Sequence, residues 1–259
     1  MSPLARSLGR ALGSRSSLRP CAGTLWGCAA RARAPLCSSA SEKPALRGVV
    51  FDLDGTLTVP NLDFAEMYRR CGVDRRLDIL REIAAMPPHR AREATAVVDE
   101  MEAEGRRTLQ LINGAVACAQ WLASRRIPMA LVTRNTQETV KHFHARLWEP
   151  QGLPPLSPAL SRDGVVGASD SPLSELPAKP DPAAMFAIAK VWGVPVGPGL
   201  VMVGDSPSND VAFGKAAGVS TVLLDSSRKH EEGLGPNTPD LHVQSLAELP
   251  HLFAEHFRL

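Results

Sequence analysis

Short apolar runs separated by segments of helical periodicity constrain the fold of this chain more than any other feature. Four runs have the length and composition of buried strands: residues 47–51, 127–132, 200–203 and 219–224. Three segments carry apolar residues at helical spacing: residues 114–124, 136–147 and 183–192. Strands that alternate with helices pair in parallel, because each crossover helix covers a face of the sheet. The sequence therefore predicts an α/β fold with a doubly wound parallel sheet.

A charged helical region interrupts this pattern after the first strand. Residues 62–110 contain no strand-like run, and their apolar residues follow helical spacing. Pro87 and Pro88 break the region into at least two helices, because proline ends or kinks a helix. We predict a small all-helical cap at residues 62–110, inserted into an α/β core formed by residues 42–61 and 111–259.

The first 41 residues differ in composition from the rest of the chain. They contain six arginines and no Lys, Asp or Glu, which is typical of a mitochondrial targeting segment. Leu4, Leu8 and Leu12 recur at four-residue spacing, so a short amphipathic helix can form there. We expect residues 1–41 to be a disordered segment that directs the protein to mitochondria. The alternative is that these residues carry no targeting signal and that the protein is cytoplasmic.

Charge and hydropathy disfavour two classes of partner. The chain has 29 Lys and Arg residues against 27 Asp and Glu. Because six of the basic residues lie in the leader, the remaining chain is net acidic, and we expect no nucleic-acid partner. No apolar run approaches the roughly 18 residues that span a bilayer, so we expect no membrane span. A small-molecule substrate is the remaining expectation.

Polar residues follow the predicted strands where ligands bind in open α/β sheets, beyond the carboxyl ends of the strands. The motifs at these ends are Asp52-Leu53-Asp54-Gly55-Thr56, Thr133-Arg134-Asn135, and Gly204-Asp205 continuing through Asn209-Asp210. A fourth motif, Lys179-Pro180-Asp181-Pro182, opens the helix predicted at residues 183–192. We expect these side chains to meet at one edge of the sheet.

The four motifs, in this order, resemble those of the haloacid dehalogenase-like hydrolase superfamily, and their spacing matches its phosphatase branch. The resemblance covers residues 47–226. The segments VPNLDF after the first motif and LVTRN at the second are most similar to those of an uncharacterised plant and animal subgroup with a short helical cap. The resemblance implies a Rossmann-like core and hydrolysis of a small-molecule phosphate monoester, without naming the substrate.

Motif positions imply four catalytic residues. Asp52 is the nucleophile that forms an aspartyl-phosphate, which divides hydrolysis into two easier steps. Asp54 is the general acid for the leaving alkoxide and then the base for water. Lys179 offsets charge in the transition state, and Thr133 supplies a hydroxyl to a phosphoryl oxygen. Because a dehalogenase has no alkoxide to protonate, Asp54 favours phosphate ester hydrolysis over dehalogenation.

Converging carboxylates would repel a dianionic ester unless a hard divalent cation lies between them, so Mg²⁺ is the expected cofactor. The resemblance gives Asp52 and Asp205 as side-chain ligands, Asp54 as a backbone-carbonyl ligand, and Asp210 as a partner of metal-bound water. Asp210 stands five residues after Asp205, and Asn209 occupies the more usual four-residue position. The expected substrate-binding residues are Gly55, Thr56, Thr133, Arg134, Asn135 and Lys179.

Two other functions use the same motifs. A phosphomutase transfers a phosphoryl group within a sugar phosphate, and a catalytically idle binding or scaffold protein keeps the fold without turnover. A mutase shares all four motifs with a phosphatase, so the motifs do not separate the two, and they do not indicate the oligomeric state. Arg69, Arg70, Arg75 and Arg76 in the cap are candidates to contact a second anionic group on the substrate.

Overall fold

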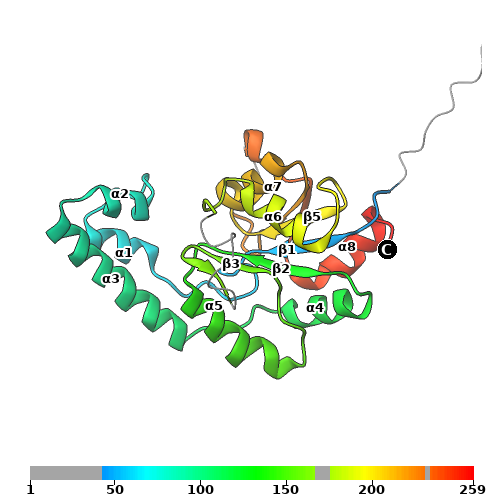
Figure 1. The fold of residues 1–259 in the computed structure, drawn as a ribbon, viewed down its shortest axis with the longest axis horizontal. Coiled ribbons are helices and arrows are strands. Elements are labelled where there is room, and N and C mark those ends of the chain that lie inside the picture. Colours follow the sequence, from blue (N-terminus) through cyan, green and yellow to red (C-terminus); the bar gives the residue numbers. More distant parts are fainter. Residues whose placement is uncertain (1–42, 167–175, 231–233) are drawn as a thin grey trace, which may run out of the picture. The chain divides into compact units, whose positions relative to one another are not determined.

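A sheet of seven strands, with helices on both faces, forms the core of the computed structural model, which describes residues 43–166, 176–230 and 234–259 (Figure 1). The strands are β1 (Gly48–Phe51), β2 (Met129–Val132), β3 (Ala159–Ser161), β4 (Gly164–Val165), β5 (Leu200–Gly204), β6 (Ser220–Leu224) and β7 (Leu241–Val243). Their order is β4-β3-β2-β1-β5-β6-β7, and only the β3 and β4 pair is antiparallel among them. The predicted doubly wound α/β fold is confirmed. The leader predicted at residues 1–41 lies outside the described residues.

Alternate residues of the buried strands pack against different helix layers, as the two-residue period of a strand requires. Val49 and Phe51 of β1 belong to the cluster that contains α4 (Ala115–Ser124), α5 (Gln137–Phe143) and α8 (Leu249–His256). Val50 belongs to the cluster that contains α6 (Ala183–Trp192) and α7 (Ala212–Ala217). Both faces of β1 are therefore covered, and β1 lies between β2 and β5.

Short helical turns connect several of these elements. They are the π-helical turns η1 (His144–Trp148) and η3 (Pro207–Val211), and the 3-10 turns η2 (Glu149–Gln151), η4 (Gly235–Asn237) and η5 (Leu246–Glu248). No helix within the described ranges is long and apolar enough to cross a bilayer.

Three helices form the cap: α1 (Phe64–Cys71), α2 (Ile79–Ala85) and α3 (Pro88–Arg107). The side chains of Asp63 and Asp78 accept backbone hydrogen bonds at the starts of α1 and α2, as N-cap residues do. Pro88 occupies the first position of α3, where a backbone N–H would have no partner within the helix and its absence costs nothing. The helices enclose a small apolar cluster of their own.

The two linkers between cap and core run beside each other. The Val59 amide donates to the Gln110 carbonyl at 2.9 Å, and the Ile112 amide donates to the Leu57 carbonyl at 3.0 Å. The Asn61 side-chain amide also donates to the Gly105 carbonyl near the end of α3 at 2.6 Å. This pairing holds the cap next to the carboxyl ends of β1 and β2, so residues of both parts line one cavity.

Candidate active site

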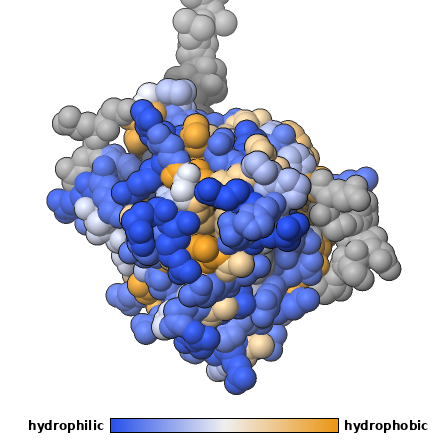
Figure 2. All heavy atoms as spheres, turned by 90° about the vertical axis from the view of Figure 1, so that its left-hand side faces the viewer, coloured by the Kyte–Doolittle hydropathy of each residue, from blue (hydrophilic) through white to orange (hydrophobic). Residues whose placement is uncertain are grey.

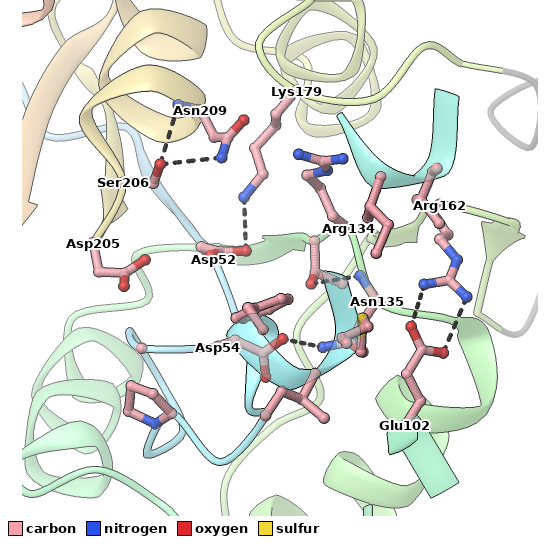
Figure 3. A pocket seen from close by; sticks show the side chains of 18 of the residues that line it. Asp52, Asp54, Glu102, Arg134, Asn135, Arg162, Lys179, Asp205, Ser206 and Asn209 are labelled. Atoms are coloured by element: carbon pink, nitrogen blue, oxygen red, sulfur yellow. Dashed lines mark hydrogen bonds and ion pairs between the residues drawn. The ribbon is translucent and has the colours of Figure 1, made fainter. Parts of the chain in front are cut away.

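A cavity of about 320 Å³ lies between the carboxyl ends of the parallel strands and the cap. Its core side contains side chains from the loops after β1, β2, β3 and β5, and its cap side contains side chains from all three cap helices. Figure 3 shows the polar side chains pointing toward one another across this space. The strand ends predicted from sequence thus meet at one site.

Three carboxylates gather at the core end of the cavity. One oxygen atom from each of Asp52, Asp205 and Asp210 lies within 4.8 Å of the others. The pairing of β1 with β5 explains the approach, because the Asp52 amide donates to the Val203 carbonyl and so places Asp52 beside the end of β5. A cluster of carboxylate oxygens at this separation suits a hard cation such as Mg²⁺.

Lys179 joins this cluster from the loop before α6. Its ammonium Nζ lies 2.6 Å from one carboxylate oxygen of Asp52 and 2.6 Å from one of Asp210. Burial by itself would lower the pKa of Lys179, but the two carboxylates outweigh burial and raise it. Lys179 therefore stays protonated and holds two acids in fixed positions.

Asp54 lies beside the cluster and accepts a hydrogen bond from the side-chain amide of Asn135. Burial raises the pKa of the Asp54 carboxyl to about 7, and the negative charge of Asp52 acts in the same direction. A carboxyl group with a pKa near neutrality can donate a proton and take one back at physiological pH.

Two glycines leave the room that the carboxylates occupy. Gly55 has φ +74°, and a Cβ atom there would lie 2.2 Å from Oδ2 of Asp205. A Cβ atom on Gly204 would lie 2.2 Å from Cγ of Asp210. A side chain at either position would collide with an acid of the cluster, so both glycines are required by close approach.

The segment after β2 contributes three of the residues predicted to bind substrate. The Thr133 hydroxyl accepts a hydrogen bond from the Asn135 amide at 3.1 Å, and Thr133, Arg134 and Asn135 all line the cavity. Arg134 also reaches Asp78 at the start of α2, with 2.5 Å between Nη2 and Oδ2. Thr56 differs from these three, because it is fully buried, does not line the cavity, and leaves its hydroxyl without a hydrogen-bond partner.

Glu102 and Arg162, which no motif predicted, also line the cavity. Both terminal guanidinium nitrogens of Arg162, which follows β3, donate to the two carboxylate oxygens of Glu102 on α3. Glu102 is buried. Two signals could have identified the pair. Arg162 stands just beyond a strand end, and Glu102 follows Ala94 and Val98 at four-residue spacing, so an acid occupies the buried face of a helix.

The cap arginines that were candidates for a second anion do not line the cavity. Arg69 pairs with Glu66, Arg70 with Glu100, and Arg76 with Asp74. Local geometry places Glu66 and Asp74 within reach of their arginines, whereas Arg70 on α1 meets Glu100 across the packed helices α1 and α3. The arginines that line the cavity are Arg134 and Arg162.

The negative charge of Asp205 is unfavourable in its partly buried, acidic surroundings, and a stability measurement can detect this. Burial, together with the charges of Asp52 and Asp210, raises its pKa to about 7. Because the folded-state pKa is raised, charging Asp205 at pH 8 destabilises the metal-free protein. We expect Asp205→Asn to raise the free energy of unfolding at pH 8 in EDTA by roughly 1–3 kcal/mol. The gain should shrink as the pH falls toward about 4, where an unfolded aspartate is also protonated.

The measurement is urea denaturation at pH 8 and pH 5, with EDTA or Mg²⁺. An ion held by the three acids would bind the folded state alone, so Mg²⁺ should stabilise the unsubstituted protein and should stabilise Asp205→Asn much less. Asp99→Asn, an exposed substitution on α3, is the matched control and should change neither result. A metal-free Asp205→Asn protein less stable than the parent at pH 8 would contradict the electrostatic account.

Comparisons with known proteins agree with this geometry. A family model described as haloacid dehalogenase-like hydrolase matches residues 46–218. A haloacid dehalogenase-like hydrolase domain-containing protein of Arabidopsis thaliana is 34% identical over 237 residues, which cover 85% of this chain and 88% of the relative. A phosphoglycolate phosphatase of Pseudomonas fluorescens is 31% identical over 229 residues, or 78% of each chain.

A solved structure of a hydrolase from Pseudomonas syringae has the same fold. Its TM-score is 0.62 at 16% sequence identity, and the match covers 82% of this chain and all of the other. The family match includes the cap and all four motifs, so it contains every residue selected above for the site. The predicted membership is confirmed: the chain belongs to the haloacid dehalogenase-like hydrolases.

Proposed function

We propose that this hydrolase is a Mg²⁺-dependent phosphatase that cleaves a small-molecule phosphate monoester through an aspartyl-phosphate on Asp52. The observation that carries the proposal is the convergence of Asp52, Asp205 and Asp210, with Lys179 bound to Asp52 and Asp210. Asp54 lies beside this cluster. The curated relative named phosphoglycolate phosphatase supports a phosphatase activity.

In the first step a carboxylate oxygen of Asp52 attacks phosphorus, and the ester P–O bond breaks. The departing alkoxide takes the proton of Asp54, whose raised pKa keeps that proton available near pH 7. Lys179 and the Thr133 hydroxyl stabilise the charge that spreads over the phosphoryl oxygens. The product of this step is an alcohol and an acyl phosphate on Asp52.

In the second step Asp54, now ionised, takes a proton from a water molecule as that water attacks the phosphorus of the acyl phosphate. The bond between Asp52 and phosphorus breaks, inorganic phosphate leaves, and both acids return to their starting protonation states. One group thus serves as acid and then as base, which requires a pKa close to the working pH.

Asp52, Asp205 and the backbone carbonyl of Asp54 would hold Mg²⁺, and Asp210 would orient a ligand water. When bound, the ion would neutralise the acids and polarise the phosphoryl oxygens. Asp210 also accepts a hydrogen bond from the Ser206 amide at 3.0 Å, and with Lys179 this fixes its carboxylate. Asn209, the alternative outer partner, instead bonds through its side-chain amide to the Ser206 hydroxyl at 3.1 Å.

Asp52→Asn tests the nucleophile. An amide does not form an acyl phosphate, so we expect phosphate release from p-nitrophenyl phosphate to fall to background, while circular dichroism and the urea midpoint show a folded protein. Asp74→Asn, at an exposed cap position, is the control and should retain activity. Release at the parental rate by Asp52→Asn would exclude the mechanism. The mutase alternative needs a sugar phosphate as the substrate of the unsubstituted protein. Phosphate that stays on an isomeric sugar, rather than appearing in solution, would favour the mutase.

Asp54→Asn tests the separate roles of acid and base. p-Nitrophenolate leaves without a proton, so the first step should survive, whereas hydrolysis of the acyl phosphate should slow by about 10²- to 10⁴-fold. Rapid mixing should therefore show a burst of about one p-nitrophenol per site, followed by a slow phase. An equally slow reaction without a burst would place the defect in the first step and contradict this separation of roles.

We also propose that residues 1–41 direct the enzyme to mitochondria, because they are rich in arginine and lack acids. Residues 1–41 fused to a fluorescent protein should colocalise with a mitochondrial dye, and the protein without them should not. Cytoplasmic fluorescence from the fusion would overturn this assignment.

A further inference from the structure

The cap side of the active-site cavity is mainly apolar. The apolar side chains that line this side come from α1, α2, α3 and the preceding linker: Leu62, Phe64, Met67, Ile79, Leu80 and Val98. Met67, Ile79 and Val98 also belong to the buried cluster inside the cap. The interior of the cap therefore opens directly onto the space that the leaving group of a phosphate ester would fill.

Phe64 is the exception among these side chains, because it remains 51% exposed at the start of α1. Figure 2 shows the cap side of the molecule, where hydrophilic side chains dominate and apolar ones are visible between them. An exposed aromatic side chain that also lines the active-site cavity gains from contact with an apolar ligand, which removes its surface from water.

The charged side chains in the cap half of the cavity are already paired. Arg134 is bound to Asp78, and Arg162 is bound through two hydrogen bonds to Glu102. A carboxylate on the leaving group would share a guanidinium with one of these cap acids, and the two like charges would repel each other in a partly buried site. Among the described residues that line this half, each arginine already has a carboxylate partner that balances its charge.

The cavity has room for more than the phosphoryl group. Its volume of about 320 Å³ lies at the lower end of the range of roughly 300–1,000 Å³ that holds small organic ligands. A phosphoryl group at the carboxylate cluster therefore leaves space for several carbon atoms beside Phe64, Met67 and Val98.

We propose that the substrate is a phosphate monoester with an uncharged, apolar leaving group of several carbon atoms, and that Phe64 is a specificity-determining residue for it. This proposal rests on the proposed phosphatase function. It distinguishes this enzyme from its relatives named phosphoglycolate phosphatase, because the leaving group of phosphoglycolate carries a carboxylate.

The experiment compares kcat/KM, measured by phosphate release with Mg²⁺, for ethyl, butyl and hexyl phosphate and for phosphoglycolate. The three alkyl esters have similar chemical reactivity, so differences among them report contacts with the leaving group. Burial of each methylene should raise kcat/KM by about fourfold until the cavity is full. Ethyl phosphate and phosphoglycolate match in carbon number, and we expect the uncharged ester to react at least as well.

Phe64→Ser should reduce kcat/KM for hexyl phosphate by about fivefold or more and leave ethyl phosphate nearly unchanged. Leu77→Ser is the matched control, because Leu77 is 48% exposed on the cap and does not line the cavity. That variant should keep the chain-length dependence of the parent. Because both side chains are about half exposed, neither substitution should prevent folding.

The outcomes separate the two proposals. An increase with chain length that Phe64→Ser reduces and Leu77→Ser retains supports the apolar leaving group. Release of phosphate that is independent of chain length, or is fastest from phosphoglycolate, overturns this inference and leaves the phosphatase proposal intact. Absence of release from all four esters and from p-nitrophenyl phosphate overturns the proposed function, and the leaving-group assignment with it.

Discussion

The ammonium group of Lys179, held between the carboxylates of Asp52 and Asp210, is the interaction on which the site depends. All three side chains are largely withdrawn from water, and each ion buried in this way costs several kcal/mol unless it is well paired. The arrangement is stable only when the loop after β1, the loop after β5 and the segment before α6 occupy their observed positions together. Ion pairing therefore fixes the geometry that the proposed chemistry at Asp52 requires.

The sequence indicated which side chains lie together at the core end of the cavity, because parallel strands place their carboxyl ends at one edge of a sheet. Asp52, Thr133 and Asp205 follow three strands that are adjacent in the fold but far apart in the chain. The shortness of some strands limited the prediction of the sheet elsewhere. β4 has two residues and β7 has three, and runs this short carry no recognisable alternation of apolar and polar residues.

Side chains whose partners come from distant segments were harder to predict. Periodicity indicated helices in the cap, but a helix pattern does not show which part of the core a given residue meets. The partnership of Glu102 with Arg162 depends on how the linkers at Val59 and Gln110 pair. Thr56 is the opposite case, a residue that its motif position indicated but that does not reach the cavity. The tight turn that contains Gly55 buries its hydroxyl.

The two halves of the cavity are constrained by different physical requirements. The core half must balance the charge of its acids, so substitution of Asp205 or Lys179 alters both charge and position. In the cap half, Met67 and Val98 contribute to the apolar interior of the cap as well as to the cavity wall, so a change that reshapes the wall also destabilises the cap. Phe64 is not part of that interior and is half exposed. A change of leaving-group selectivity with little loss of stability is therefore most accessible at Phe64, where contact with a ligand and packing of the cap are separate.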